Sequence, residues 1–291
     1  MRFLITIKEM TESVKHKLLI ASRIADGFNA DLSIIYVGKK PRSINETEVA
    51  MVRRSLADWK FYHPAFEVLQ WAYKIILENE YIEEGTEFNP KNIIEENGRI
   101  RVVLPQSSGR KIRLILREGI MLDELKKETE HHKYEIAIIG KPKKKRQLHN
   151  FIQFLDTSIF IVNNFNPTWD YKILICVDDS KATKKAVLFG SRISKQFDTE
   201  VICLTASKTK RFGKGYQGAS KWAQKYLRLQ KIESTSKFVT GNPVDVFIKE
   251  ASDNHIIVMG KTKSSEFFKF FRGSKPIHTA QKADCPVLIV K

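Results

Sequence analysis

Residues 172–206 read KILICVDDSKATKKAVLFGSRISKQFDTEVICLTA, and this stretch decides the fold class. Apolar runs at its two ends predict strands, and the apolar residues between them recur at the spacing of an amphipathic helix. Continued to the last residue, the same reading predicts strands at 172–177, 200–205, 236–240, 256–259 and 286–290 and helices at 182–196, 220–231, 243–252 and 274–282. Mostly apolar strands that alternate with helices predict an α/β fold, with a doubly wound, mostly parallel five-stranded sheet and helices on both faces.

The same plan occurs twice in the chain. Residues 2–37 repeat the apolar pattern of 172–206, and residues 118–141 align with 240–261. The second alignment places Gly119 on Gly241, Asp123 on Asp245, Glu128 on Glu250 and Gly140 on Gly260. We therefore predict two tandem doubly wound units, a degenerate one at 1–164 and a second at 171–291, joined by the turn-rich segment 163–171, NNFNPTWDY.

The first unit carries an insertion at about 39–117. It contains a helical stretch, WKFYHPAFEVLQWAYKIILENEYIEE, which is interrupted at Pro64. Two alternating runs follow around Ser107, Ser108 and Gly109, and they predict a β-hairpin. We interpret this insertion as a contact surface.

The charge of the chain is strongly positive and uneven. Fifty Lys and Arg residues against 33 Asp and Glu residues give +17. Residues 166–291 hold 23 of the basic and 11 of the acidic residues, or +12, which leaves +5 for the remainder. This excess favours a polyanionic partner such as nucleic acid, acidic lipid or nucleotide phosphate.

The apolar segments argue for a cytoplasmic protein without membrane insertion. The first ten residues, MRFLITIKEM, reach charged residues too early for a signal peptide, and no apolar run approaches the roughly 18 residues of a membrane span. The three cysteines each lie in an apolar run without metal-ligand spacing, so they are predicted to be core residues: Cys176, Cys203 and Cys285.

A candidate phosphate-binding loop follows the fourth predicted strand of the second unit. Residues 256–275, IIVMGKTKSSEFFKFFRGSK, have the form G-x-x-Lys-x9-G-Ser, made by Gly260, Lys263, Gly273 and Ser274. A glycine at a strand end lets a phosphate approach the backbone, and a helix start offers free amide hydrogens and a hydroxyl.

This spacing is similar to the G-x-x-G-x9-G-Ser/Thr signature of the universal stress protein family. KILICVDDS, GNPVDVFIKEASDNHIIVMG and ADCPVLIVK also resemble segments of that family. The resemblance covers 171–291 and, more weakly, the two ends of 1–164, which implies a tandem universal stress protein. It implies ATP or AMP as ligand, with Asp178 near the adenine and ribose, Thr205 or Leu204 at the base, and Met259, Gly260, Gly273 and Ser274 along the phosphates.

Lys263 departs from the family pattern, because ATP-binding members have a glycine there. Two interpretations stay open: the side chain fills the space for the phosphate, or its ammonium binds the phosphate. Pro276 removes one amide hydrogen from the start of the last predicted helix. In the first unit Lys8 replaces Asp178, and Gly140 to Ser158 spans 18 positions where Gly260 to Pro286 spans 26. Only the second unit is therefore expected to bind nucleotide.

No catalytic or metal-binding constellation emerges from the sequence, and we predict neither an enzyme nor a metal cofactor. His131 and His132 end a predicted helix without a third ligand. The basic run KPKKKR (141–146) is either solvated or a phosphate contact. Four phenylalanines either pack on the sheet or form a membrane wedge or stacking platform: Phe267, Phe268, Phe270 and Phe271.

The first functional hypothesis is a non-enzymatic stress-response regulator or scaffold that binds an adenine nucleotide in its second unit. The resemblance implies an intramolecular pseudo-dimer of the two units, paired through the strands 158–162 and 286–290, and leaves homodimerisation open. The alternative hypothesis is a basic module that binds nucleic acid or another polyanion through the +12 half, without a nucleotide pocket.

Overall fold

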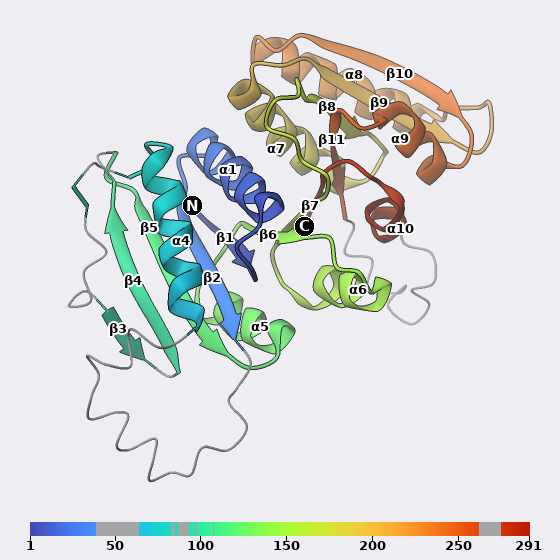
Figure 1. The fold of residues 1–291 in the computed structure, drawn as a ribbon. Coiled ribbons are helices and arrows are strands. Elements are labelled where there is room, and N and C mark those ends of the chain that lie inside the picture. Colours follow the sequence, from blue (N-terminus) through green and yellow to red (C-terminus); the bar gives the residue numbers. More distant parts are fainter. Residues whose placement is uncertain (39–63, 83–84, 87–92, 97, 107, 262–274) are drawn as a thin grey trace, which may run out of the picture. The chain divides into compact units, whose positions relative to one another are not determined.

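The computed structural model describes residues 1–38, 64–82, 85–86, 93–96, 98–106, 108–261 and 275–291 (Figure 1). Its contacts divide the chain into two compact units. Unit 1 comprises 1–25 and 29–134, and unit 2 comprises 26–28 and 135–291. Among the described residues, no helix is both long and apolar enough to cross a membrane.

Unit 1 is a mixed sheet with helices. Its elements in chain order are β1 Arg2–Ile7, α1 Glu12–Gly27, β2 Asp31–Gly38, α4 Pro64–Glu78, β3 Ile93–Glu96, β4 Arg99–Pro105, β5 Lys111–Glu118 and α5 Met121–His131. The described strands follow the order β1-β2-β5-β4-β3. The β1–β2 and β2–β5 pairs are parallel, and the other two pairs are antiparallel.

The hairpin predicted around residues 107–109 is confirmed as β4 and β5. Arg99 pairs with Arg117 across it, and Pro105 with Lys111. The other edge of β5 pairs with β2, so six consecutive residues of β5 are buried. α4 begins at Pro64, a position in the first turn where the missing amide hydrogen of proline costs nothing, and it contacts β2 and β5.

Unit 2 contains the longer sheet. Its elements are β6 Ile136–Gly140, α6 Lys145–Phe154, β7 Ser158–Val162, β8 Lys172–Cys176, α7 Lys181–Phe197, β9 Val201–Ser207, α8 Lys214–Leu229, β10 Ser234–Thr240, α9 Pro243–Ala251, β11 His255–Gly260, α10 Lys275–Lys282 and β12 Val287–Val290. The strands follow the order β10-β9-β8-β11-β12-β7-β6. All neighbours are parallel except β12 and β7.

The winding of unit 2 places helices on both faces of its sheet, as predicted. From β8 the chain moves outward through α7, β9 and α8 to β10, and it then returns past β8 to β11 and β12. Because parallel crossovers are right-handed, the helices before and after this reversal cover opposite faces. α7 contacts α8, and α9 contacts α10, as this arrangement requires.

The predicted strands of residues 172–291 are confirmed within two residues. α8 begins at Lys214, six residues before the predicted start at 220. The prediction of five strands in each of the units 1–164 and 171–291 is not confirmed, because the compact units have other boundaries. The described residues place five strands in unit 1 and seven in unit 2, because β6 and β7 join the second sheet through β12.

Gly119 and Gly241, which the sequence aligns, have the same backbone role. Their φ angles are +149° and +156°, in a region that favours glycine. Gly119 donates its amide hydrogen to Gly38 O at the end of β2, and Gly241 donates to Ser207 O at the end of β9. β5 therefore has the place before α5 that β10 has before α9. The insertion predicted at 39–117 thus includes a strand of the repeated plan.

The two strands predicted to pair across the halves of the sequence do so. β12 runs antiparallel to β7, with Leu288 opposite Phe160. We call the β7–β12 pair the joint between the two halves of the sequence. Two lysines that follow the aligned Gly140 and Gly260 each add a hydrogen bond across it. Lys141 Nζ donates to Ala283 O after α10 at 2.7 Å, and Lys261 Nζ donates to Ile152 O in the last turn of α6 at 3.0 Å. Each ammonium thus stabilises the negative end of a helix from the other half.

Candidate functional site

The candidate site lies at the carboxyl ends of β8 and β11, where the winding of the sheet reverses. β8 pairs with β9 on one side and with β11 on the other. Ligands of open α/β sheets bind in the crevice beyond such strand ends. β8 ends at Cys176, two residues before Asp178, and β11 ends at Gly260. The structure therefore places Asp178 and Gly260 at one edge of the sheet, where the sequence predicted them.

Asp178 is held rigidly through one of its two carboxylate oxygens. Its Oδ1 accepts hydrogen bonds from Ser180 N at 3.0 Å, Ser180 Oγ at 2.5 Å and Thr183 Oγ1 at 2.7 Å. The Asp178 amide in turn donates to Thr183 Oγ1 at 3.1 Å. The side chain is half-buried, and within the described part of the chain Oδ2 accepts no hydrogen bond. The three hydrogen bonds to Oδ1 fix the orientation of the carboxylate and leave Oδ2 available as an acceptor.

The first turn of α7 packs directly on Gly260. A Cβ atom at Gly260 would lie 2.6 Å from the carbonyl carbon, the carbonyl oxygen and the Cβ of Ala182. The absence of a side chain is therefore required by helix packing, independently of any phosphate. The same contact brings the helix N-terminus, with its partial positive charge, to the end of β11.

Tyr216 belongs to this edge of the sheet, and the sequence reasoning missed it. A Cβ at the neighbouring Gly215 would lie 3.0 Å from the Cβ of Asp179, so the start of α8 packs close to the turn after β8. Burial raises the pKa of the Tyr216 phenol, and the charges of Asp179 and Asp178 raise it further. The helix was predicted to begin at 220 and so excluded Tyr216, and the close packing on Asp179 explains a glycine inside its first turn.

The residues predicted to line the base and the backbone path are buried. Leu204 and Thr205 are fully buried on β9, and Met259 is 3% exposed on β11. The Thr205 hydroxyl has no hydrogen-bond partner in the described part of the chain, which is unusual for a buried polar atom. It is the one predicted base-lining residue with an unmet hydrogen-bonding capacity.

The remaining predicted site residues lie outside the described residues: Lys263, Gly273 and Ser274. The phenylalanines of the same segment are also outside them. Lys261, the residue after Gly260, donates to Ile152 O, and burial lowers its pKa. Its charge is directed to the end of α6 and not to the candidate site.

The tip of β1 in unit 1 has a different chemistry. Lys8 follows the strand and is exposed. Lys17 of α1 is buried, and its ammonium donates to Thr6 O at 2.6 Å. Burial lowers the pKa of Lys17 to about 8, with a smaller contribution from Lys8. Lysines thus occupy the end of β1, whereas Asp178 occupies the corresponding position at the end of β8 in the second half of the chain.

The other reactive side chains take no part in a site. The three cysteines are buried and free, and burial raises the pKa of Cys203 and of Cys285 to about 12 and that of Cys176 well above its ordinary value. They are core residues, as predicted. His131 closes α5, and its Nδ1 lies 2.6 Å from Lys127 O. The described residues contain no group of three or more potential metal ligands.

Known proteins share the fold of this chain. The sequence model of the universal stress protein family matches residues 171–291. The chain is similar in structure to a universal stress protein from Archaeoglobus fulgidus DSM 4304, with a TM-score of 0.64 and 14% identity over 100% of this chain and 96% of that chain. A functionally unknown protein from Pseudomonas aeruginosa PAO1 gives a TM-score of 0.58 and 10% identity over 100% and 92% of the two chains.

A shorter structure is also similar, the universal stress protein from Archaeoglobus fulgidus in complex with dAMP. It has a TM-score of 0.35 and 20% identity, and the match covers 42% of this chain and 98% of that chain. None of the curated proteins matches the chain. Residues 171–291 therefore form a domain of the universal stress protein family, within a chain that shares its whole fold with a protein of that family.

Proposed function

We propose that this protein binds an adenine nucleotide, ATP or AMP, at the carboxyl ends of β8 and β11, and that it acts as a stress-response regulator or scaffold. The observation that carries the proposal is the geometry of Asp178. Three donors hold Oδ1, and Oδ2 has no partner in the described part of the chain. A preorganised acceptor of this kind suits a ribose hydroxyl or an adenine amino group.

The neighbouring side chains support a binding role without catalysis. Asp178, Asp179 and Tyr216 lie close together at this edge, and the raised pKa of Tyr216 keeps its phenol protonated at neutral pH. A protonated phenol donates a hydrogen bond but does not act as a general base. Nucleotide binding, rather than turnover, is the function that these groups fit.

The proposal is tested by calorimetric titration of the full chain with ATP and AMP. Asp178→Asn keeps an oxygen acceptor for Ser180 and Thr183 but removes the charge at the free oxygen. We expect about a tenfold loss of affinity, the effect of one charged hydrogen bond. Asp253→Asn is the matched control, because Asp253 is exposed and precedes β11 at the opposite edge of the sheet. Absence of saturable binding at about 1 mM nucleotide would refute the proposal.

The role of Lys263 is decided by Lys263→Gly in the same titration. If the lysine obstructs the phosphate, the glycine variant binds nucleotide more tightly than the parent protein. If the ammonium contacts the phosphate, the variant loses affinity, by about tenfold for one charge-assisted contact. Equal affinities would place the phosphate away from residue 263.

A further inference from the structure

The segment between β9 and β10 carries an unbroken series of positive charges. Residues 208–231 contain eight Lys and Arg residues and no Asp or Glu. All eight are exposed: Lys208, Lys210, Arg211, Lys214, Lys221, Lys225, Arg228 and Lys231. Eight charges from one segment are a large share of the +12 carried by residues 166–291.

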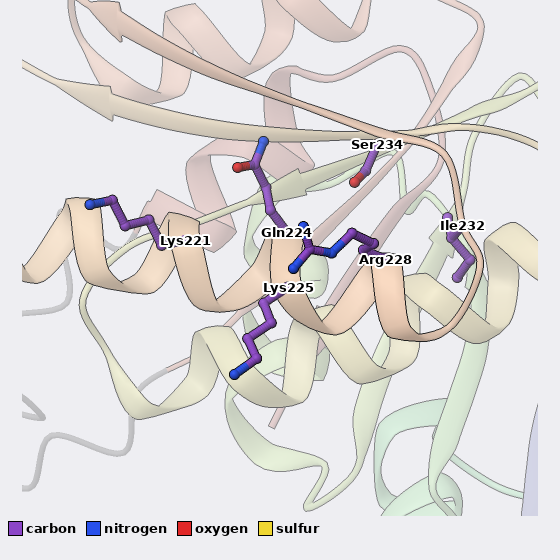
Figure 2. Close-up of a pocket in the computed structure, with 6 residues that line it drawn as sticks. All are labelled: Lys221, Gln224, Lys225, Arg228, Ile232 and Ser234. Atoms are coloured by element: carbon purple, nitrogen blue, oxygen red, sulfur yellow. The ribbon is translucent and has the colours of Figure 1, made fainter.

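Three of these cations line a pocket on unit 2 with a volume of about 400 Å³. Lys221, Lys225 and Arg228 occur at helical spacing along α8, with Gln224 between them (Figure 2). Ile232 and Ser234 line it from the turn into β10. Figure 2 shows Gln224 extending from the helix toward the strand side, while Lys225 extends the other way. We call this surface, made by the six lining residues, the α8 pocket.

The cations of the α8 pocket are available to a ligand. None of the three forms a salt bridge within the described part of the chain, whereas Lys172, Lys237 and Lys282 of the same unit do. Within the described part of the chain, the side chains of Gln224 and Ser234 also form no hydrogen bond. Three cations and two neutral hydrogen-bonding groups without an acidic neighbour in the lining are suited to an anion with several oxygen atoms.

The α8 pocket is separate from the candidate nucleotide site. Arg228 lies in the last turn of α8, and Ser234 is the first residue of β10. The pocket therefore lies toward the amino end of β10, whereas Asp178 and Gly260 lie at the carboxyl ends of β8 and β11. In a parallel sheet these are opposite edges. Occupation of one site does not require the other.

We propose that α8 and the basic turns that flank it bind the phosphate backbone of a nucleic acid, with the α8 pocket at the centre of the contact. The cations extend over the length of a 16-residue helix, about 24 Å, which matches a linear series of phosphates better than one isolated phosphate. The contact is independent of base sequence. Trp222 and Tyr226 of α8 stack on each other, with their ring centroids 5.6 Å apart, and Lys184 lies over the Trp222 ring. These rings are therefore already packed, and the proposed contact is with phosphates and not with bases.

The test uses fluorescence anisotropy of the full chain with a labelled single-stranded oligonucleotide of about 20 nucleotides, at several salt concentrations. The parent protein is expected to bind with an affinity that falls steeply as salt rises. The triple variant K221Q/K225Q/R228Q is expected to lose at least about tenfold in affinity at low salt. The slope of log affinity against log salt should also decrease by about 2, from about 0.7 for each lost phosphate contact.

The matched control is K111Q/K133Q/K249Q, which removes the same charge from three exposed lysines outside residues 208–231. It is expected to change the affinity by less than about threefold. Equal losses in the two triple variants would show diffuse attraction by net charge and overturn the proposal. The absence of a complex at about 50 mM salt would also overturn the proposal. Displacement of the oligonucleotide by poly-glutamate at matched charge would overturn it as well, because it would identify an acidic protein as the partner. We expect these variants to leave the calorimetric titration with ATP unchanged, so the two proposals can fail separately.

Discussion

Glu128 and Glu250 occupy aligned positions in the two halves of the sequence, yet one lies in a buried ion cluster and the other near the surface. The side chain of Glu128 is 0% exposed, and its oxygens accept hydrogen bonds at 2.7 to 2.9 Å from Arg99, Arg117 and Tyr134. Glu250 pairs with Lys237 of β10 at 3.2 Å, and the Lys237 side chain is 47% exposed. The same position of the plan thus supports two different kinds of ion pair.

The difference follows from what covers the third strand of each plan. β5 has β4 on its outer side, and Arg99 of β4 lies opposite Arg117 of β5. β10 is the last described strand of its sheet and is half-buried or exposed along its length. An additional hairpin strand therefore turns a surface ion pair into a buried cluster. The repeat places Glu128 and Glu250 at equivalent backbone positions, and the added strand β4 decides whether the ion pair at that position is buried.

The largest expected effect comes from removing the buried charge. Glu128→Gln leaves the buried Arg99 without a carboxylate and Arg117 with only Glu124, at 3.5 Å, and we expect the free energy of unfolding to fall by about 3–5 kcal/mol. Glu250→Gln, at the aligned surface position, should cost less than about 1 kcal/mol. Urea unfolding of both variants measures the contrast. Similar losses in the two variants would show that covering by β4 has no energetic consequence.

The pH dependence sharpens this contrast. Burial alone would raise the pKa of Glu128, but Arg99 and the hydrogen bonds from Tyr134 and Arg117 outweigh it and hold the pKa below its ordinary value of 4.5. A depressed pKa in the folded state stabilises the protein above the pKa of the unfolded chain, and the stabilisation is lost as the pH falls below it. The difference between the parent protein and Glu128→Gln should therefore shrink as the pH is lowered below about 4.5.

The buried Lys17, whose ammonium binds the end of β1, provides a second pH-dependent test. Lys17 has a pKa of about 8 in the folded protein against 10.5 ordinarily, chiefly because it is buried. Between these values the unfolded chain binds more protons, so the stability from this group rises with pH, by about 3 kcal/mol in total. Lys17→Met should abolish that rise, as measured by urea unfolding from pH 7.5 to 10.5. Lys15→Met is the control on the same helix, and an equal loss of pH dependence in it would contradict the assignment.

The elements of this fold were predictable because they depend on local patterns, whereas the charge pairing depends on the tertiary fold. The apolar runs predicted β8, β9, β11 and β12, and the alternation around 107–109 predicted the hairpin. Nothing local marks Glu128 as buried, since Arg99 lies 29 positions away and meets it only when β4 pairs with β5. The partner of Lys261 is likewise 109 positions distant. At the candidate site, Asp178 and Gly260 were predictable from strand ends, and Tyr216 was not, because α8 starts six residues before the predicted helix.

Gly260 distinguishes helix packing from phosphate access as the reason for a glycine. Gly260→Ala places a Cβ 2.6 Å from the backbone of Ala182, and we expect a loss of about 1–3 kcal/mol in the free energy of unfolding without any nucleotide present. Gly218→Ala, inside α8 with no atom within 4 Å of the new Cβ, should instead stabilise the protein by about 0.5–1 kcal/mol. Thermal unfolding of the two variants compares them. An unchanged stability for Gly260→Ala would leave phosphate access as the explanation.

The smallest expected effect tests the reciprocal joint at β7 and β12. Lys141 and Lys261 follow aligned glycines, and each donates to a backbone oxygen at the carboxyl end of a helix in the other half of the chain. Lys141→Met and Lys261→Met should each lower the free energy of unfolding by about 1 kcal/mol, from one hydrogen bond and the interaction with the helix dipole. Because the two contacts share no residue, the double variant should lose the sum of the single effects. A loss confined to Lys261→Met would show that the joint is asymmetric, with the second half of the chain stabilising the first but not the reverse.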